Sequence, residues 1–152
     1  MSKKAIIFFL FLTILIPLTG QKIVPTPADL YKDAVEFMYS EDYKDALFIL
    51  LNLQENGYQN ANTSYIIGEC YLNIQGQKTR SIPYLKEASQ KVSPGYKGNA
   101  LEEEYAPVKT LLYLGIAYRI NNDFDNALHY LNSYLNAIDD VDKDEKNLAE
   151  FH

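Results

Sequence analysis

The chain has 152 residues, of which 47% are hydrophobic and 22% charged, values that suit one globular domain with a buried core. Its formal net charge is −6 and its Lys and Arg residues do not cluster, so nucleic-acid binding, which needs grouped cations facing phosphates, is not expected. Gly and Pro number only 7 and 6, and no long run alternates β-branched with polar residues, which favours helices over strands.

The first 20 residues have the layout of a secretory signal peptide. Two lysines precede a mainly apolar run, residues 5–16. A membrane-spanning helix needs about 20 apolar residues, so this run is short for a span. We therefore expect cleavage after Gly20 and export of residues 21–152, with an uncleaved anchor as the alternative. No Cys lies near the end of the run, which excludes a lipoprotein anchor at that point.

Two pairs of similar segments indicate an internal repeat. Residues 42–47 (DYKDAL) and 123–128 (DFDNAL) both read acid, aromatic, polar, polar, Ala, Leu, and residues 79–85 hold a weaker copy. Residues 67–71 and 114–118 share a second pattern, an aliphatic residue followed by Gly, two variable positions and Tyr. The two patterns are the halves of one unit, because the Ala-Leu pattern follows the Gly pattern at a nearly constant spacing: Ala127 comes 12 residues after Gly115, and Ser81 comes 13 residues after Gly68.

Each pattern has a physical role in a pair of packed helices. Gly68 and Gly115 carry no side chain, so a partner helix can approach closely there. Small residues stand on the second helix where the two backbones cross: Ala46, Ser81 and Ala127. Apolar residues then recur every three to four positions, the period of an amphipathic helix. One pair cannot bury both of its faces, so successive pairs are expected to stack as a solenoid.

This organisation resembles the tetratricopeptide repeat (TPR) family, whose unit is a helix-turn-helix of about 34 residues. The resemblance implies an all-α fold, an antiparallel helix-pair solenoid of about three repeats. The repeats are expected over residues 27–57, 61–92 and 105–138. Their helices, in chain order, are expected over residues 27–39, 43–56, 61–74, 80–91, 105–121 and 124–138. The first repeat departs most from the family, since Ala34 replaces its Gly and Phe37 its Tyr.

Two segments outside the repeats are expected to begin without regular secondary structure. One lies between the second and third repeats, and the other follows the third repeat. Residues 93–98 (SPGYKG) carry loop signals. Glu102–Glu104 precede the expected helix start at Tyr105, where acids favour the positive helix end. Residues 139–146 are expected to lead into a short capping helix over 144–151. The alternating acids of residues 140–144 resemble a calcium loop but lack its Gly and its final Glu, so a solvated turn is the preferred interpretation.

No arrangement typical of catalysis or metal binding is evident in the sequence. Cys70 is the single Cys and lies in an apolar stretch, which indicates a small buried hydrophobe; a catalytic thiol would need a nearby base, and the two His residues are His129 and His152. No phosphate-binding loop, nucleophile elbow or metal-spaced His or Cys pair is present. We therefore expect no catalytic residue, no metal, no cofactor and no small-molecule substrate.

In TPR proteins the first helix of each pair lines a concave groove, and the resemblance implies such a groove here. Apolar and aromatic surface with isolated charges is typical of a protein-binding site, and Tyr and Arg are favoured anchors. The 13 Tyr residues could instead form an aromatic ligand box, although at helical spacing core packing is favoured. Counting from the Gly positions predicts these groove residues: Tyr31, Met38, Tyr39, Tyr65, Glu69, Leu72, Leu112, Ile116 and Arg119.

A more specific resemblance is to the N-terminal repeats of Bacteroidetes-type envelope proteins. In that family a WD-like β-propeller and often an OmpA-like peptidoglycan-binding domain follow the repeats, and some members serve type IX secretion. The resemblance rests on residues 68–72 (GECYL), 81–85 (SIPYL), 104–107 (EYAP) and 113–118 (YLGIAY).

The envelope resemblance implies a non-catalytic, protein-binding scaffold in the periplasm or on the periplasmic face of the outer membrane. A partner protein, or a downstream domain of the same protein, is expected in the groove. Residues 147–152 lie within an expected helix that has no Gly or Pro stop signal, which suggests that the sequence is the front of a longer protein. A small periplasmic adaptor that ends at His152 is the alternative.

Overall fold

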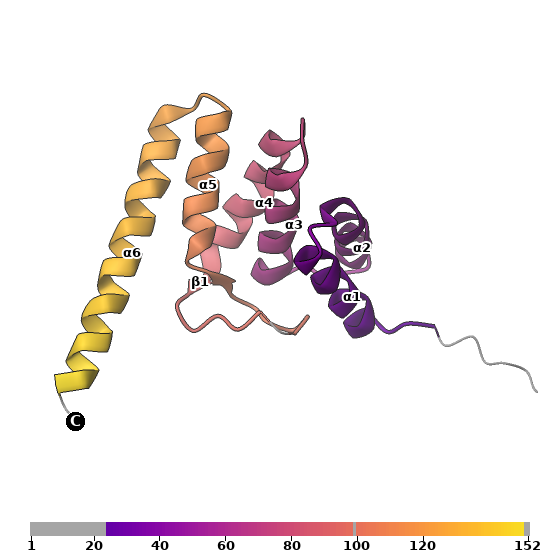
Figure 1. Ribbon diagram of the computed structural model, residues 1–152, viewed down its shortest axis with the longest axis horizontal. Helices are drawn as coiled ribbons and strands as arrows, with labels where there is room; N and C mark the ends of the chain where they lie inside the picture. Colours follow the sequence, from indigo (N-terminus) through magenta and orange to yellow (C-terminus); the bar gives the residue numbers. More distant parts are fainter. Residues whose placement is uncertain (1–23, 99, 151–152) are drawn as a thin grey trace, which may run out of the picture.

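The computed structural model describes residues 24–98 and 100–150, with side chains up to residue 139. The expected signal peptide therefore lies outside the described residues. In the described part, the chain folds into six α-helices that follow one another as three pairs (Figure 1). The pairs are α1 (Pro27–Tyr39) with α2 (Tyr43–Glu55), α3 (Ala61–Asn73) with α4 (Ser81–Ala88), and α5 (Lys109–Ile120) with α6 (Phe124–Glu150).

Each helix packs against the next one along the chain, from α1 to α6. Single 3-10 turns, η1 (Lys78–Arg80) and η2 (Ser89–Lys91), extend α4 at its two ends. The all-α, antiparallel helix-pair solenoid expected from the repeat pattern is therefore confirmed. No helix in the part of the chain that the structure covers is both long enough and apolar enough to cross a membrane.

Local signals set the helix ends. Thr26 caps α1: its hydroxyl accepts from the backbone N–H of Asp29 at 3.2 Å, and the Asp29 carboxylate accepts from the Thr26 N–H at 2.9 Å. Asn60 and Thr63 cap α3 in the same reciprocal way. The tight turns inside the first and third pairs use a residue in left-handed conformation, Glu41 (φ 62°) and Asn122 (φ 60°).

The helix pairs cross at the small residues that the repeat pattern singles out. A Cβ added to Gly68 would lie 2.5 Å from Leu85 Cγ on α4. A Cβ added to Gly115 would lie 2.8 Å from Leu131 Cγ and 3.2 Å from the Ala127 carbonyl oxygen on α6. The small residues of the second helices, Ala46, Ser81 and Ala127, are all buried, as is Ala34 in the place of the first Gly. The predicted register is thus confirmed.

Two helix boundaries differ from the sequence prediction. α5 begins at Lys109, later than the expected Tyr105, because Ala106–Pro107 form a short strand, β2, that pairs in parallel with β1 (Val92–Ser93). Glu102–Glu104 therefore do not stand directly before the start of a helix, as the sequence analysis expected. The expected separate capping helix is also wrong: α6 continues from Phe124 to Glu150 without a break. The segment after residue 138 contains no Gly or Pro that would end a helix.

The loop that joins β1 to β2, residues 94–105, folds back over the helices, and we call it the strap. Its Pro94–Gly95 turn agrees with the predicted loop. From β1 the strap runs past the end of α3 toward α1 (Figure 1). It carries Leu101, which is 4% exposed, into the hydrophobic core. The strap is therefore part of the packed structure and defines one wall of the site described next.

Candidate functional site

A pocket of about 270 Å³ opens between α1, α3 and the strap. We call it the α1–α3 pocket. Its walls combine aliphatic and aromatic side chains with three charged groups, so it offers both apolar area and directional contacts. Its lining residues are Val35, Met38 and Tyr39 of α1, Tyr43 of α2, Tyr65, Ile66 and Glu69 of α3, Tyr96, Lys97 and Gly98 of the strap, and Lys109 of α5.

Glu69 is the polar centre of this pocket. Its carboxylate accepts hydrogen bonds from the hydroxyls of Tyr65 and Tyr113, the latter at 3.0 Å. Lys109 Nζ lies 3.9 Å from the same carboxylate, whose side chain is 18% exposed. A largely buried carboxylate is stable only when its oxygens are hydrogen-bonded or paired, and these three donors meet that need.

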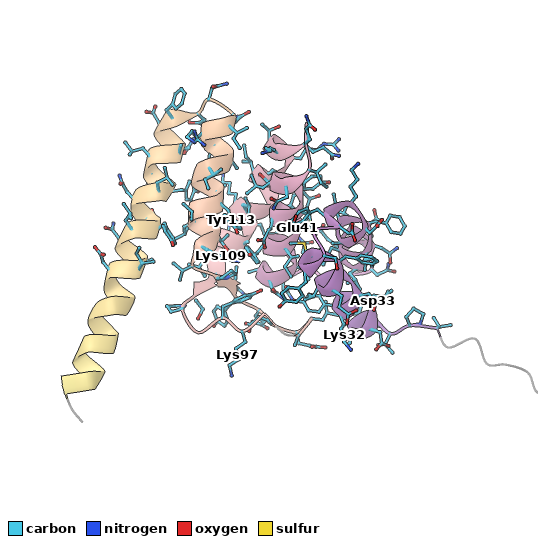
Figure 2. All side chains as sticks on the ribbon, viewed as in Figure 1. Lys32, Asp33, Glu41, Lys97, Lys109 and Tyr113 are labelled. Carbon is cyan, nitrogen blue, oxygen red and sulfur yellow. The ribbon has the colours of Figure 1, made fainter. Side chains whose placement is uncertain are left out.

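Lys109 is held over two aromatic rings. Its Nζ is 5.3 Å from the Tyr65 ring centroid and 5.6 Å from the Tyr113 ring centroid, within the range of cation–π attraction. The two rings stack with centroids 6.1 Å apart. Figure 2 shows Lys109 and Tyr113 on α5, on the side facing α3, whereas Lys97 projects from the strap away from the helices. Lys109 is therefore positioned by the pocket, and Lys97 is free to meet a ligand from outside.

The strap is held to the helices mainly through its backbone carbonyls. Asn62 Nδ2 donates to the Ala100 carbonyl at 3.1 Å, and Asn60 Nδ2 donates to the Leu101 carbonyl at 2.7 Å. The Tyr31 hydroxyl donates to the Gly98 carbonyl at 3.2 Å. The polar side chains on this face of the solenoid thus bind a non-helical piece of polypeptide chain by its peptide groups.

Asn62 is the hub of this network and is fully buried. Besides the Ala100 carbonyl, its Nδ2 donates to the Tyr31 hydroxyl at 2.7 Å, and its Oδ1 accepts from the Tyr96 hydroxyl at 2.6 Å. The Tyr96 ring also meets the Tyr65 ring edge-on, with centroids 6.0 Å apart. One side chain therefore links α1, α3 and the strap.

Burial keeps the phenols of this site protonated. Burial raises the pKa of Tyr31, Tyr65 and Tyr96, and for Tyr65 the neighbouring Glu69 carboxylate adds to the effect. The pKa of Tyr113 rises to about 12, through burial first and Glu69 second. These hydroxyls are therefore hydrogen-bond donors at neutral pH.

Cys70 lies beneath the pocket and is fully buried, as the sequence predicted. Its Sγ contacts the Met38 Sδ at 3.1 Å, and burial raises the pKa of its thiol to about 12. Since the thiolate is the reactive form, Cys70 acts here as a packing residue.

The predicted groove residues fall into three groups, of which the first and the last share Tyr65. Met38, Tyr39, Tyr65 and Glu69 line the α1–α3 pocket. Leu112 and Ile116 are half-buried and Arg119 is exposed; all three lie on α5 outside that pocket. Tyr31 (3% exposed), Tyr65 (3%) and Leu72 (9%) are buried, so the expectation that they present open surface is wrong.

The physical reason for the correction is largely the strap. The Gly98 carbonyl of the strap accepts a hydrogen bond from Tyr31, and the Tyr96 ring of the strap packs edge-on against Tyr65, so the strap covers both side chains. Leu72 is part of the hydrophobic core. Sequence reasoning also missed several residues that build the site, among them Asn60, Asn62, Tyr96, Lys97, Lys109 and Tyr113. The capping pattern of Asn60 and Thr63 was a readable signal, but nothing in the local sequence shows that a side chain will reach a distant loop.

In the described part of the chain, no group of His, Cys, Asp and Glu side chains is arranged to hold a metal ion. Comparisons of the chain with protein-family models, with curated proteins and with solved structures found no match.

Proposed function

We propose that this chain is a non-catalytic scaffold that binds an extended polypeptide segment of a partner protein in the α1–α3 pocket. The observation that carries the proposal is the strap. The strap carbonyls of Gly98, Ala100 and Leu101 accept hydrogen bonds from the side chains of Tyr31, Asn62 and Asn60, respectively. This face of the solenoid thus already holds one non-helical segment of polypeptide against its helices, and the α1–α3 pocket opens beside that segment.

The open pocket next to the strap has the features of a binding site for such a segment. Val35, Met38 and Ile66 offer an apolar wall for one side chain of the partner. Tyr39 is 86% exposed at the rim, a large aromatic surface of the kind that anchors protein interfaces. Lys97 and Lys109 favour a segment that carries carboxylates over a basic one.

The proposal extends to family and location. Three helix pairs that cross at Gly or small residues support a TPR-type repeat array. The signal-like residues 1–20 support export, and the resemblance to the TPR segment of type IX secretion-associated proteins with an OmpA-like domain supports a place in the periplasm or on the outer membrane.

A second candidate function is that of a structural module whose groove is filled by a downstream domain. The strap favours this candidate in one respect, because it is a segment of the chain itself that occupies part of this face.

Capture from an envelope extract tests the proposal. Tyr39→Ala should abolish capture of proteins that the wild-type chain retains, while its melting temperature stays nearly unchanged because the side chain is 86% exposed. Phe48→Ala is the matched control, since Phe48 is an aromatic residue on α2 that is 76% exposed and lies outside the pocket. Proteins retained by wild type and Phe48→Ala but lost with Tyr39→Ala are the expected result.

Two other results would contradict the proposal. Equal capture by all three proteins would show that binding does not use the pocket. No specific capture by the wild-type chain would instead favour the structural module, whose groove is reserved for its own downstream domain.

A further inference from the structure

A second pocket adjoins the α1–α3 pocket along α1. It has a volume of about 340 Å³ and lies between the N-terminal part of α1 and the strap, and we call it the α1–strap pocket. Val35 and Gly98 line both pockets, so the two meet where the strap passes α1. Gly98 has no side chain, so the strap presents only its backbone at this point. A polypeptide that fills the α1–α3 pocket can therefore reach the second pocket with its next residues.

The walls of the α1–strap pocket are apolar. Ala28 and Val35 of α1 form one wall, and Leu101 of the strap belongs to the other. Leu101 and the neighbouring Tyr31 are both part of the hydrophobic core, so these walls are in place before a ligand arrives. A pocket of this kind favours the aliphatic part of a side chain.

The charged groups around the α1–strap pocket are mainly acidic. Asp29 and Glu102 line it, and Glu103 lies near Tyr31 of the same lining. Lys32 also lines the pocket, and its charge acts on Asp29. The pairing of Lys32 with Asp29 leaves the carboxylates of Glu102 and Glu103 to set the sign of the charge. The rim of the pocket is therefore negative.

We propose that the α1–strap pocket binds an Arg or Lys side chain of the partner segment that occupies the α1–α3 pocket. Such a side chain has an aliphatic stem, which suits the apolar walls, and a cationic head, which suits the acidic rim. The inference rests on the proposed function and adds to it a second contact of opposite charge, because Lys97 and Lys109 favour a carboxylate in the first pocket.

The positions of the two pockets on α1 also set the spacing of the two contacts. The α1 residues that line them are centred about two turns apart, which is roughly 10 Å at about 1.5 Å per residue. An extended chain rises about 3.3 Å per residue, so it covers this length in about three residues. The basic residue should therefore stand about three positions from the residue in the α1–α3 pocket.

Peptide selection tests the proposal. A phage-displayed library of random linear peptides, long enough to span both pockets, is selected on the purified chain. Fluorescence anisotropy then gives the dissociation constants of the enriched peptides. These peptides should carry the predicted Arg or Lys, and Glu102→Lys should weaken their binding about tenfold, because it places a cation beside the cationic head.

Two controls separate this contact from general charge and folding effects. Glu55→Lys makes the same change in net charge at an exposed site on α2 and should leave the dissociation constants unchanged. Glu102 is itself exposed, so the melting temperature of Glu102→Lys should match that of wild type. A peptide with norleucine in place of its basic residue should bind wild type and Glu102→Lys with similar affinity, because the contact between the two charges is then missing.

The outcomes separate this inference from the proposed function. Failure to enrich any peptide whose binding is lost with Tyr39→Ala would overturn the proposed function and this inference with it. Peptides that depend on Tyr39 but bind Glu102→Lys as tightly as Glu55→Lys would overturn this inference alone. An equal loss of affinity for the basic and the norleucine peptides would do the same, since Glu102 would then act without contacting the cation.

Discussion

At the scale of single residues, the fold depends on places where a side chain is missing. Gly68 and Gly115 let the two helices of a pair approach until the Leu of the second helix fills the space that a Cβ would need. Both positions also have a backbone atom nearby: a Cβ at Gly115 would lie 3.2 Å from the Ala127 carbonyl oxygen, and a Cβ at Gly68 would lie 3.4 Å from the Leu85 nitrogen. The shorter backbone contact at Gly115 can be relieved only if α6 moves.

Gly115→Ala should therefore destabilise the protein by about 1–3 kcal/mol through overpacking, and Gly115→Leu by more. The matched control is Gly95→Ala, because a Cβ at Gly95 would meet only Ser93 Oγ at an ordinary 3.6 Å. Urea unfolding followed by circular dichroism measures both free energies. Equal stability of the two Ala variants would show that the α5–α6 crossing is looser than described.

At the scale of elements, the strap is the feature that distinguishes this solenoid from a plain stack of helix pairs. It adds no regular secondary structure beyond the two-residue ladder of β1 and β2. Its attachment depends on buried polar groups, and such groups stabilise a structure only while each has its partner.

Asn62→Ala should accordingly be costly. It removes the donor to the Ala100 carbonyl and the Tyr31 hydroxyl and the acceptor of the Tyr96 hydroxyl. Each buried group left unpaired costs about 1–3 kcal/mol. Asn73→Ala is the control, since Asn73 is an exposed residue at the end of the same helix and should change stability by no more than about 0.5 kcal/mol. Similar midpoints of denaturation for the two variants would contradict this account.

The contrast between helices and strap explains what the sequence could predict. The positions of the helices were predictable because hydrophobic periodicity and the spacing of small residues such as Gly115 and Ala127 can be seen in the sequence itself. The path of the strap depends on contacts such as that between Tyr31 and Gly98, 67 residues apart, for which no local pattern exists. For the same reason the helical face of Tyr65 was predictable but its burial under Tyr96 was not.

At the scale of the whole molecule, the buried phenols make stability depend on pH in the alkaline range. Tyr31, Tyr65, Tyr96 and Tyr113 have a pKa above the ordinary 10.0 in the folded state, chiefly because of burial. The unfolded chain therefore releases these protons first as the pH rises. Their contribution to stability is complete below pH 10 and is lost progressively above it.

The free energy of unfolding should thus fall between pH 10 and about 12, the raised pKa of Tyr113. Urea titrations at several pH values measure it, and the near-ultraviolet absorbance of tyrosinate should rise together with the loss of helix. Tyr113→Phe should show a shallower fall, because one raised pKa is removed. Stability that stays constant over this interval would contradict the burial of these phenols.

The hydrogen bond from Tyr31 to the strap also changes how the array can come apart. A linear stack of repeats has only nearest-neighbour contacts, so its end units can fray one at a time. Here α1 is tied to a segment that lies beyond α4 in the chain, through the Gly98 carbonyl and through Asn62. The first helix cannot detach without also releasing the connection between the second and third pairs. The N-terminal end is thereby incorporated into the cooperative unit of the middle repeat, and the α6 end remains the one from which unfolding can begin.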